Sequence, residues 1–468
     1  MRRASGLLVH GASALVLAFV ALASGPLVSF VTAPVALLLV AQALAVRRGS
    51  GPDAPRRSVG LGLATLGFSL LLLAAAGPAA ALLVAIAGLA LLLWGTHTAL
   101  EFDSPPRGQM LPPGFDPLLH AGVAADEAIR LGLELVRLRN PSPEHAQAAA
   151  EARIAADRNR EQGWLDRPER AHPIPPPLEK PHLVSCQVRG SGAAERLSFA
   201  SEFEPLDLEV RDEYLALRRN RIAQATLFRD RRHPRPALIF VHGYGMGWAP
   251  LDARVAGVEW LRRDLGLDVA LFALPLHRAL SPGRRAGAGF LEGYPLWTNA
   301  VMGQAVWDLR RLAGFLRVEG APAVGVFGLS TGGLAAAVLA SVEEGLACAI
   351  TMTAPVSLEA LFWRLLGPAR SAEVRAAGLT PHILERAWAR HAPLRMRPRV
   401  PHAARLVVGG LADRIVPPEQ VAALWEHWGQ PAVHWFPGTH VVWRQAPAIR
   451  QRIASHLRET LASAAQPQ

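Results

Sequence analysis

The segment VGVFGLSTGGLAAAVL, residues 324–339, decides the fold of this chain. Its first residues form an apolar run typical of a β-strand, and its last residues favour a helix. Ser330 lies between the two, with Gly328 two residues before it and Gly332 two residues after it. Such small residues allow a sharp turn in which neighbouring backbones come close and a serine hydroxyl is lifted clear of a sheet. The segment therefore predicts a strand, a tight turn that presents a serine, and a helix.

Three further turns follow apolar, strand-like runs and contain side chains that could act with the serine. They are HGYG at residues 242–245, GGLADRIVPP at residues 409–418 and PGTH at residues 437–440. Strand-like runs alternate with helical segments through this part of the chain. That alternation predicts a parallel sheet covered by helices.

These four motifs, taken in their order along the chain, resemble those of the α/β-hydrolase superfamily, and the resemblance extends from about residue 215 to the C-terminus. It implies the α/β-hydrolase fold, a mainly parallel sheet flanked by helices and covered by a helical lid. It also implies a catalytic triad of Ser330, Asp413 and His440. Ser330 would be the nucleophile and His440 the general base, while Asp413 would hold the histidine in the right tautomer.

The resemblance further implies an oxyanion hole made of two backbone N–H groups. The donors would be Tyr244, in the HGYG turn, and Thr331, the residue after the nucleophile. His277 follows another strand-like run, and we interpret it as structural or pocket-lining. We expect His242 to brace its turn rather than transfer protons. The motif or pocket residues around the donor are His242, Gly243 and Gly245.

Two of these assignments have competitors. His434 is a second histidine near the C-terminus, but it falls inside a predicted strand, where a side chain reaches over the nucleophile less easily than one on a loop. Asp413 could instead be an ordinary turn aspartate or a helix N-cap, because prolines follow it closely.

Four apolar stretches occupy the first hundred residues, and each is about 16 to 20 residues long, near the minimum for spanning a bilayer. They are residues 7–23, 27–46, 59–76 and 79–94. Arginines precede the first stretch and lie between the second and third, whereas the other two turns carry no charge. The positive-inside rule therefore predicts that both termini and the catalytic domain are cytoplasmic, at an inner or plasma membrane.

Two alternatives exist for this region. A signal peptide is one for the first stretch, since Ala21-Leu22-Ala23 fits a cleavage site after an apolar core. Three spans would then remain, and the rest of the chain would stay on the same side. The other alternative is that the stretches are buried helices of a soluble bundle. Four long uncharged runs in succession argue against it.

The chain is longer than one core usually supports, so we expect several structural units. Residues 1–97 would form a transmembrane region of about four helices. Residues 98–181 would form a helical stalk and a proline-rich linker, and residues 182–468 the α/β-hydrolase domain with a lid at about 358–400. The lid mixes apolar residues with arginines. That mixture suits an acyl chain with an anionic head group or an anionic lipid surface, and equally a cap that packs its apolar stripe on the domain.

Composition excludes several classes of function. The net charge of +11 is carried almost wholly by arginine, and no basic run interleaves with aromatic residues as in a nucleic-acid groove. We interpret the charge as a membrane-surface signal and expect no nucleic-acid partner. The two cysteines, Cys186 and Cys348, are far apart and match no metal or redox spacing, so we expect no disulfide framework. The sequence indicates neither a metal nor an organic cofactor.

The sequence thus predicts a membrane-anchored serine hydrolase that cleaves a carboxylic ester or thioester through an acyl-enzyme. The membrane location favours lipid-derived acyl substrates, and membrane lipids are the expected partners of the N-terminal helices. An acyltransferase with the same triad is a second reading, because only the acceptor that reaches the pocket differs. A catalytically silent membrane scaffold is a third, and an intact strained nucleophile turn argues against it.

The topology is testable with reporters fused after Gln468. We expect a reporter that works only in the cytoplasm to be active, because the arginine-rich turns stay on that side. Activity of only a reporter that requires the outside compartment would contradict the predicted orientation.

Overall fold

The structure is a computed structural model of the 468-residue chain. It describes residues 2–24, 26–48, 53–102, 105–106, 108–112, 114–139, 145–179, 181–277, 280–281, 287, 290 and 294–462. The chain divides into two compact units. The first comprises Met1–Asn140, Gly410–Pro418 and Pro437–Arg444, and the second comprises Pro141–Gly409, Glu419–Phe436 and Gln445–Gln468. The division does not follow sequence order, because two short C-terminal segments join the N-terminal unit.

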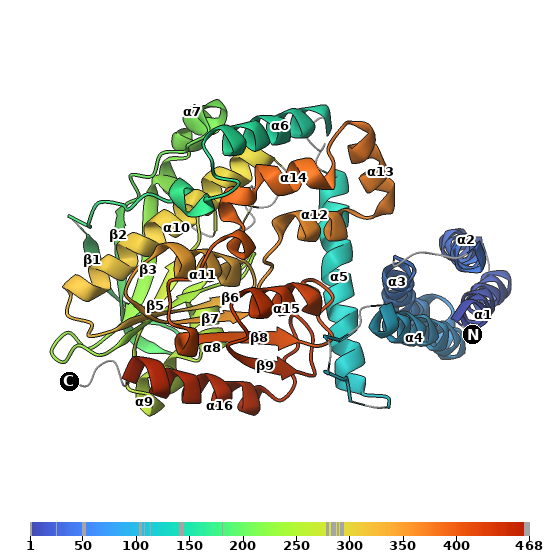
Figure 1. Cartoon of the computed structure of the whole chain (residues 1–468). Coiled ribbons are helices and arrows are strands. Elements are labelled where there is room, and N and C mark those ends of the chain that lie inside the picture. Colours follow the sequence, from blue (N-terminus) through green and yellow to red (C-terminus); the bar gives the residue numbers. More distant parts are fainter. Residues whose placement is uncertain are drawn as a thin grey trace. The chain divides into compact units, whose positions relative to one another are not determined.

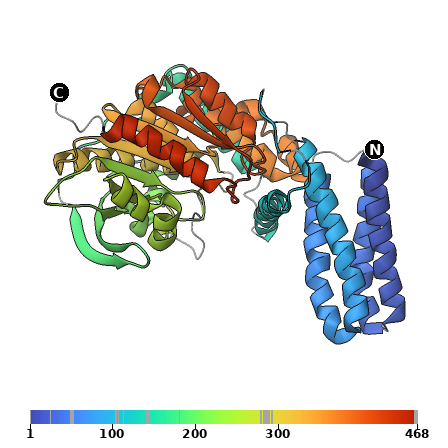
Figure 2. The ribbon, with the colours of Figure 1, turned by 90° about the horizontal axis from the view of Figure 1, so that it is seen from below.

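Long helices build the first unit. They are α1 (Arg2–Ala23), α2 (Pro26–Arg48), α3 (Ala54–Ala75), α4 (Gly77–Phe102) and α5 (Pro117–Arg139). Figure 2 shows α1 to α4 lying side by side as a bundle. Runs of Ala, Leu and Val without charge favour these helices, and Gly77, at a positive φ of 83°, marks the turn between α3 and α4.

Three of these helices are long and apolar enough to cross a membrane, among the residues that the structure describes. The spans are Ala4–Ala23, Ala54–Ala75 and Gly77–Glu101, and Thr32–Val46 within α2 is a shorter apolar segment. Large apolar side chains stand exposed along the bundle, including Leu8, Leu15, Leu22 and Leu70. Exposed apolar surface on this scale is typical of contact with lipid or another apolar partner.

In the described part of the chain, the second unit is built on a nine-stranded sheet with the order β1-β2-β3-β5-β4-β6-β7-β8-β9. The strands are β1 (His182–Val188), β2 (Gly192–Ala200), β3 (Ile222–Phe228), β4 (Ala237–Val241), β5 (Asp268–Ala273), β6 (Val324–Leu329), β7 (Leu346–Met352), β8 (Arg405–Gly410) and β9 (Ala432–Phe436). Pairing is antiparallel from β1 to β5 and parallel from β5 through β4, β6 and β7 to β8. The predicted mainly parallel sheet is confirmed, with an antiparallel edge added.

Helices cover both faces of this sheet. They are α7 (Leu208–Ala216), α8 (Ala249–Ala256), α9 (Val258–Asp264), α10 (Pro295–Val318), α11 (Thr331–Val342), α15 (Pro418–His427) and α16 (Ala446–Leu457), the last continued by a π-turn at Arg458–Ala462. Figure 1 shows α10 and α11 on one face and α9 and α16 on the other. Central strand residues such as Ile239, Phe240 and Val326 are fully buried. Burial on both faces explains why these strands are continuous apolar runs rather than alternating ones.

The predicted lid region is helical. It contains α12 (Leu358–Leu366), α13 (Pro368–Ala376) and α14 (Pro381–Ala387). Short 3-10 turns lie at Pro168–Ala171, Arg218–Arg221, Ala389–His391, Pro393–Arg395 and His402–Ala404. The apolar stripe of α12, which includes Leu361 and Leu365, is buried against protein. In this structure the region is therefore a packed cap, the second of the two alternatives that the sequence left open.

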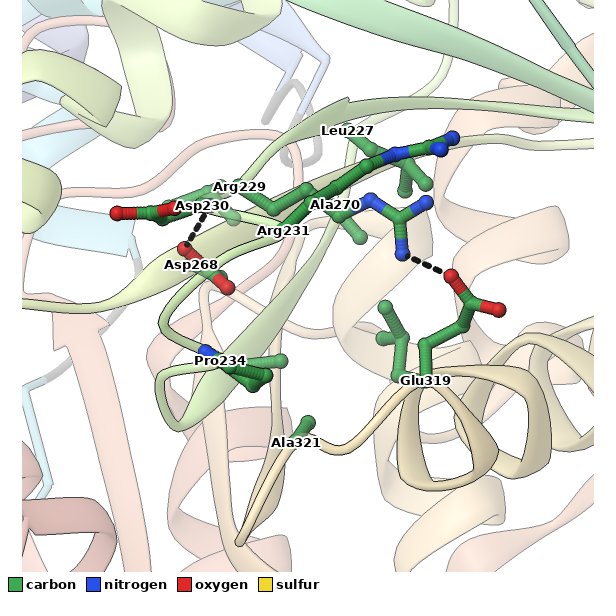
Figure 3. A pocket seen from close by; sticks show the side chains of 12 residues that line it. Leu227, Arg229, Asp230, Arg231, Pro234, Asp268, Ala270, Glu319 and Ala321 are labelled. Atoms are coloured by element: carbon green, nitrogen blue, oxygen red, sulfur yellow. Dashed lines mark hydrogen bonds and ion pairs between the residues drawn. The ribbon is translucent and has the colours of Figure 1, made fainter.

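A cavity of about 160 Å³ lies beside the antiparallel part of the sheet, and Figure 3 shows Arg229, Asp230 and Asp268 around it. Its lining includes Ala237 and Asp268, the first residues of β4 and β5. Ser330 follows the opposite, carboxyl end of β6, which is parallel to β4. The cavity therefore lies at the amino ends of the parallel strands, whereas Ser330 lies at their carboxyl ends, so the cavity does not belong to the site of Ser330.

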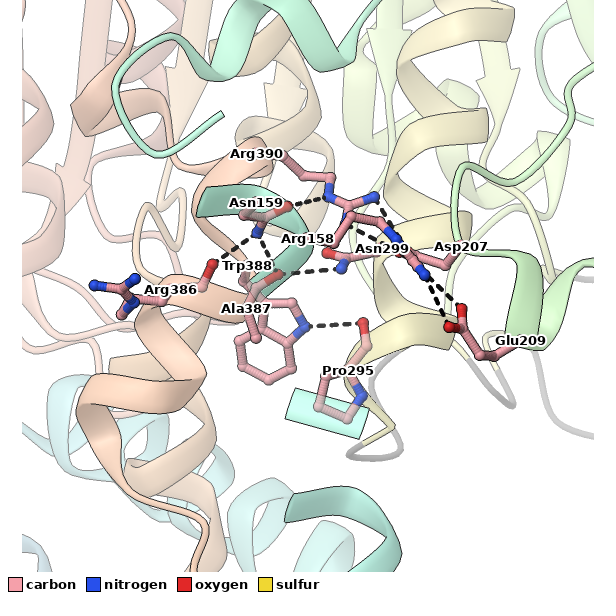
Figure 4. A network of polar contacts seen from close by, with 10 residues as sticks. All are labelled: Arg158, Asn159, Asp207, Glu209, Pro295, Asn299, Arg386, Ala387, Trp388 and Arg390. Atoms are coloured by element: carbon pink, nitrogen blue, oxygen red, sulfur yellow. Dashed lines mark hydrogen bonds and ion pairs between the residues drawn. The ribbon is translucent and has the colours of Figure 1, made fainter. Parts of the chain in front are cut away.

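A buried ionic network ties the cap to other segments of the second unit (Figure 4). Arg390, after α14, donates from Nη1 and Nη2 to the Asp207 carboxylate at 3.1 and 3.0 Å. Its Nε donates to Asn159 on α6 (His145–Glu161) at 2.9 Å. The Asn159 amide in turn donates to the main-chain oxygens of Arg386 and Ala387. The cap is therefore fixed to α6 and to the segment before α7.

Removing one partner of this network should be costly, because Arg390 and Asp207 are only 2% and 1% exposed. Asp207→Ala leaves Arg390 buried and poorly paired, which costs about 3–5 kcal/mol. We expect the melting temperature to fall by at least roughly 6 °C. Glu385→Ala, which breaks the exposed pair with Arg395, is the matched control and should cost less than about 1 kcal/mol. Equal melting temperatures for the two variants would contradict this account.

Candidate active site

Ser330 occupies the sharp turn between β6 and α11 with φ 53° and ψ −120°. A positive φ in a residue other than glycine costs on the order of 1–3 kcal/mol and persists only where surrounding structure enforces it. Here the Ser330 N–H donates to the Met352 oxygen at 2.8 Å, and the Ser330 oxygen accepts from Leu334 N–H at 3.1 Å. Contacts to β7 and to the first turn of α11 therefore hold the serine in its strained conformation.

The glycines around Ser330 are required by close backbone packing. A Cβ at Gly328 would lie 2.1 Å from the Gly332 oxygen, and a Cβ at Gly332 would lie 2.1 Å from the Val241 oxygen. A Cβ at Gly333 would meet the Ala354 Cβ at 2.7 Å. Only glycine fits these places, which is the physical basis of the predicted strand, turn and helix.

The HGYG turn after β4 lies directly against the serine. A Cβ on Gly243 would approach the Ser330 Cβ to 3.2 Å. His242 donates from Nδ1 to the Gly243 oxygen at 2.8 Å and accepts the Leu274 N–H on Nε2 at 3.1 Å. Both ring nitrogens are thus used to brace the turn, which is the role that the sequence predicts for His242. Gly245 takes a φ of 78°, a conformation that glycine adopts without strain.

Of the two expected oxyanion donors, Thr331 directly follows Ser330 in the chain, and Tyr244 belongs to the HGYG turn. Thr331 is the first residue of α11 and is buried. Tyr244 follows Gly243, and its ring contacts His277 with centroids 5.8 Å apart. The donation of hydrogen bonds by these two backbone N–H groups to an oxyanion stays a prediction.

His277 packs behind the HGYG turn. Its ring makes edge contacts with His242 at 4.9 Å and Phe290 at 5.4 Å. Nδ1 donates to the Pro275 oxygen at 2.9 Å. Burial lowers the pKa of His277 to about 4, so the ring is neutral at physiological pH. It contributes shape and packing to the turn.

The predicted acid and base are joined by a hydrogen bond. His440 Nδ1 donates to Asp413 Oδ2 at 2.7 Å. The other oxygen of Asp413 accepts the N–H groups of Ile415 and Val416 at 2.9 and 2.8 Å. Asp413 follows β8 and His440 follows β9, so each lies on a loop after a neighbouring strand. The hydrogen bond leaves Nε2 as the nitrogen of His440 that can exchange protons with a substrate.

The electrostatics of His440 suit a general base. Burial disfavours the charged imidazolium, but the carboxylates of Asp413 and Asp126 outweigh that effect and raise the pKa of His440 above its ordinary value. The competitor His434 lies inside β9, where burial and then Arg452 lower its pKa. The pair of Asp413 and His440 therefore has the arrangement that proton transfer requires, whereas His434 has no such acid partner among its described contacts.

One residue at this pair was not predicted from the sequence. Asp126, on α5, accepts the main-chain N–H groups of Arg414 and His440 on Oδ2, both at 2.9 Å, and that of Val441 on Oδ1 at 3.3 Å. All these residues belong to the first compact unit. One feature of the sequence could have indicated it. Asp126 and Glu127 lie among apolar positions of a helix, and two buried acids there would need partners because an unpaired buried charge is costly.

Comparisons with known proteins indicate the family of the chain. The family model for serine hydrolase (FSH1) matches residues 309–452, which contain Ser330, Asp413 and His440. The uncharacterized protein MT2702 of Mycobacterium tuberculosis (strain CDC 1551 / Oshkosh) is 35% identical over 348 residues, covering 73% of this chain and 82% of the relative. The chain belongs to the α/β-hydrolase superfamily. It is a serine hydrolase.

Other similar proteins are known. The uncharacterized protein Rv2627c of M. tuberculosis (strain ATCC 25618 / H37Rv) is 34% identical to the hydrolase over the same length and coverage. Acetyl xylan esterase 1 from Thermoanaerobacterium sp. JW/SL YS485 is 16% identical, with a TM-score of 0.43, covering 63% of this chain and 93% of its own. The acetyl xylan esterase from Paenibacillus sp. R4 is 14% identical, with a TM-score of 0.45, covering 65% and 95%.

The hydrolase holds no group of three or more His, Cys, Asp or Glu side chains that could bind a metal ion, among the residues described. The described structure thus gives the strained elbow serine with a braced turn beside it in the second unit, and a hydrogen-bonded acid–base pair on two loops of the first unit.

The elbow can be tested with Gly332→Ala. The new Cβ would overlap the Val241 oxygen, so the turn must shift, and we expect a loss of about 1–3 kcal/mol or more in stability. Displacing the serine by about 1 Å should also slow its reaction with an active-site reagent roughly 100-fold.

Gly314→Ala, on helix α10, is the matched control because a Cβ there meets nothing within 4 Å. That change should stabilise the helix by about 0.5–1 kcal/mol. Thermal unfolding and reagent kinetics measure both effects, and a Gly332→Ala protein as stable and reactive as the native one would refute the packing argument.

Proposed function

We propose that this hydrolase is anchored in a membrane and cleaves a carboxylic ester or thioester through an acyl-enzyme on Ser330. One observation carries the proposal: the Asp413–His440 hydrogen bond joins loops that follow β8 and β9, in the sheet whose strand β6 leads to the strained serine. In this fold, side chains after neighbouring parallel strands gather at one edge of the sheet.

The proposed reaction begins when Ser330 Oγ attacks the acyl carbon while His440 Nε2 takes its proton. Asp413 stabilises the resulting imidazolium through Nδ1. The N–H groups of Tyr244 and Thr331 hold the negative charge on the former carbonyl oxygen. Collapse of this intermediate breaks the bond to the alcohol or thiol, which leaves with the proton from His440. Water activated by the same histidine then releases the acid and restores Ser330.

The pH dependence follows from the shifted base. Only neutral His440 can accept the serine proton, and its pKa is raised above the ordinary value. Activity should therefore be lost as the pH falls through that raised pKa and be full above it.

The membrane helices support the choice of substrate. Three apolar helices belong to the same compact unit as the acid and base loops, which favours acyl substrates that partition into or near lipid. The arginine-flanked turns support a cytoplasmic catalytic domain in a multi-pass protein. The lipid contacts of α1 to α4 are its proposed interactions with the bilayer.

Acyl transfer to an acceptor other than water is the second candidate. It uses the same acyl-enzyme, and product analysis with and without an added alcohol acceptor separates the two. A silent scaffold would keep the fold without reacting. The strained Ser330 and the polarised His440 favour catalysis over that alternative.

Fluorophosphonate labelling of the detergent-solubilised full chain tests the triad. We expect the native protein to be labelled and Ser330→Ala to be unlabelled, because the reagent forms its bond with an activated serine oxygen. His440→Ala should slow labelling by roughly 10⁴-fold or more, and Asp413→Asn by a similar or smaller factor.

His434→Ala is the matched control, since it removes a histidine from β9 rather than from the acid–base pair. Its labelling rate should stay close to that of the native chain. Undiminished labelling in His440→Ala, or an unreactive but folded native protein, would overturn the proposed function.

A further inference from the structure

Helix α5 carries two adjacent acids that are almost completely buried. Asp126 is 0% exposed and Glu127 is 1% exposed. Burying a carboxylate is costly unless hydrogen bonds or opposite charges compensate for the lost hydration. The partners of these two groups therefore indicate why the helix keeps them.

Glu127 is compensated by cations. Its carboxylate accepts from Arg130 Nη1 at 2.8 Å and from Arg414 Nε at 2.9 Å. Arg414 is the residue after Asp413, so this pair fixes the side chain of the acid loop to α5. The contact explains the burial of Glu127 as a structural ion pair.

Asp126 is compensated differently. The partners of its carboxylate are the main-chain N–H groups of Arg414, in the acid loop, and of His440 and Val441, in the base loop. A single side chain thereby links the two loops of the acid–base pair. The loops also bond directly, since Ala412 N–H donates to the Gly438 oxygen at 2.9 Å. The distance between the loops is set by these contacts.

Helix α5 is itself fixed to the bundle. Glu134 pairs at 3.2 Å with Arg56, a buried arginine of α3. An apolar cluster joins α4, α5 and the acid loop, and it consists of Ala99, Leu119, Val123 and Ala412. The position of Asp126 is thus determined by the N-terminal helices.

We propose that Asp126 is a positioning residue of the hydrolase, which holds the acid and base loops in register and adds negative charge that favours the imidazolium of His440. The proposal rests on the triad given as the proposed function. It also gives the N-terminal unit a second role besides anchoring, because a helix of that unit completes the surroundings of the base.

The charges around Asp126 give the sign of its effect. Burial and the Asp413 carboxylate raise the pKa of Asp126 to about 6, while His440 and the N–H groups of Arg414 and His440 oppose the rise. Glu127 also lies nearby, and it is paired with the guanidinium groups of Arg130 and Arg414. Above about pH 6, Asp126 is charged and stabilises protonated His440. Removing that charge should therefore lower the pKa of His440.

The test is the rate constant of fluorophosphonate labelling of the full-length chain as a function of pH, over about pH 5 to 9, for native protein and Asp126→Asn. Asparagine keeps the shape and one acceptor oxygen but removes the charge. We expect the midpoint of the acidic limb to move to lower pH by about 0.5–1 unit and the plateau rate to fall several-fold. An irreversibly unfolded fraction of the sample lowers the amplitude of labelling and leaves its rate constant unchanged.

Glu134→Gln is the matched control, a carboxylate on the same helix that pairs with Arg56 in the bundle instead of the catalytic loops. The midpoint of its acidic limb should coincide with that of the native chain, even where a looser α5 lowers the plateau rate. A reduced rate in Asp126→Asn with an unmoved midpoint would assign the residue a merely structural role and overturn the proposal.

If Asp126→Asn does not fold, Asp126→Glu keeps the charge but displaces the carboxylate. It should retain an acidic limb near the native one and lose plateau rate, and full native rate would overturn the positioning role. Failure of the proposed function has a different signature. It would appear as native protein unlabelled at Ser330, or as His440→Ala labelled at the native rate.

Discussion

Three backbones meet at the nucleophile turn, and their close approach is the constraint on which the catalytic domain depends. Gly328 and Gly332 let β6, α11 and β4 approach so closely that a single added carbon at either glycine would overlap a carbonyl oxygen. The same packing holds Ser330 at a positive φ and brings the HGYG turn against it. Fold and reactivity therefore have one physical cause, because the contacts that close the sheet around α11 also strain and expose the serine.

The acid–base pair depends on a second set of contacts. Asp413 and His440 lie on loops that form a compact unit with the N-terminal helices. The buried Asp126 carboxylate on α5 accepts main-chain N–H groups of these loops, and each such donor left unsatisfied would cost about 1–3 kcal/mol. The cap also depends on a buried carboxylate, since Asp207 pairs with the buried side chain of Arg390. Polar networks of this kind contribute specificity of position more than net stability.

The features that could be predicted from the sequence are those set by neighbouring residues and by the order of motifs along the chain. The segment 324–339 predicts its strand, elbow and helix because glycine spacing and apolar patterning act over a few residues. The mainly parallel sheet and the serine hydrolase class are confirmed for the same reason, since four turns follow four strands in order. His440 and Asp413 were found as a pair because each directly follows a strand-like run.

Contacts across long sequence distances were not predictable. Asp126 meets Arg414 over a separation of 288 residues, and an amphipathic helix does not reveal which segment covers its buried face. The apolar stripe of α12 is similar, because the pattern of Leu361 and Leu365 fits either a lipid surface or a protein core. In the structure this stripe is buried against protein. The proposal of lipid-derived substrates is therefore supported by the N-terminal helices alone.

The most direct test of the central claim is to trap the acyl-enzyme. The full-length chain would be mixed with p-nitrophenyl acetate, quenched in acid within the first turnover, and digested for peptide mass mapping. The account predicts one acetyl group on the peptide containing Ser330, absent from Ser330→Ala and strongly reduced in His440→Ala. Ester hydrolysis without an acetyl group on Ser330, or with the group on another residue, would contradict it.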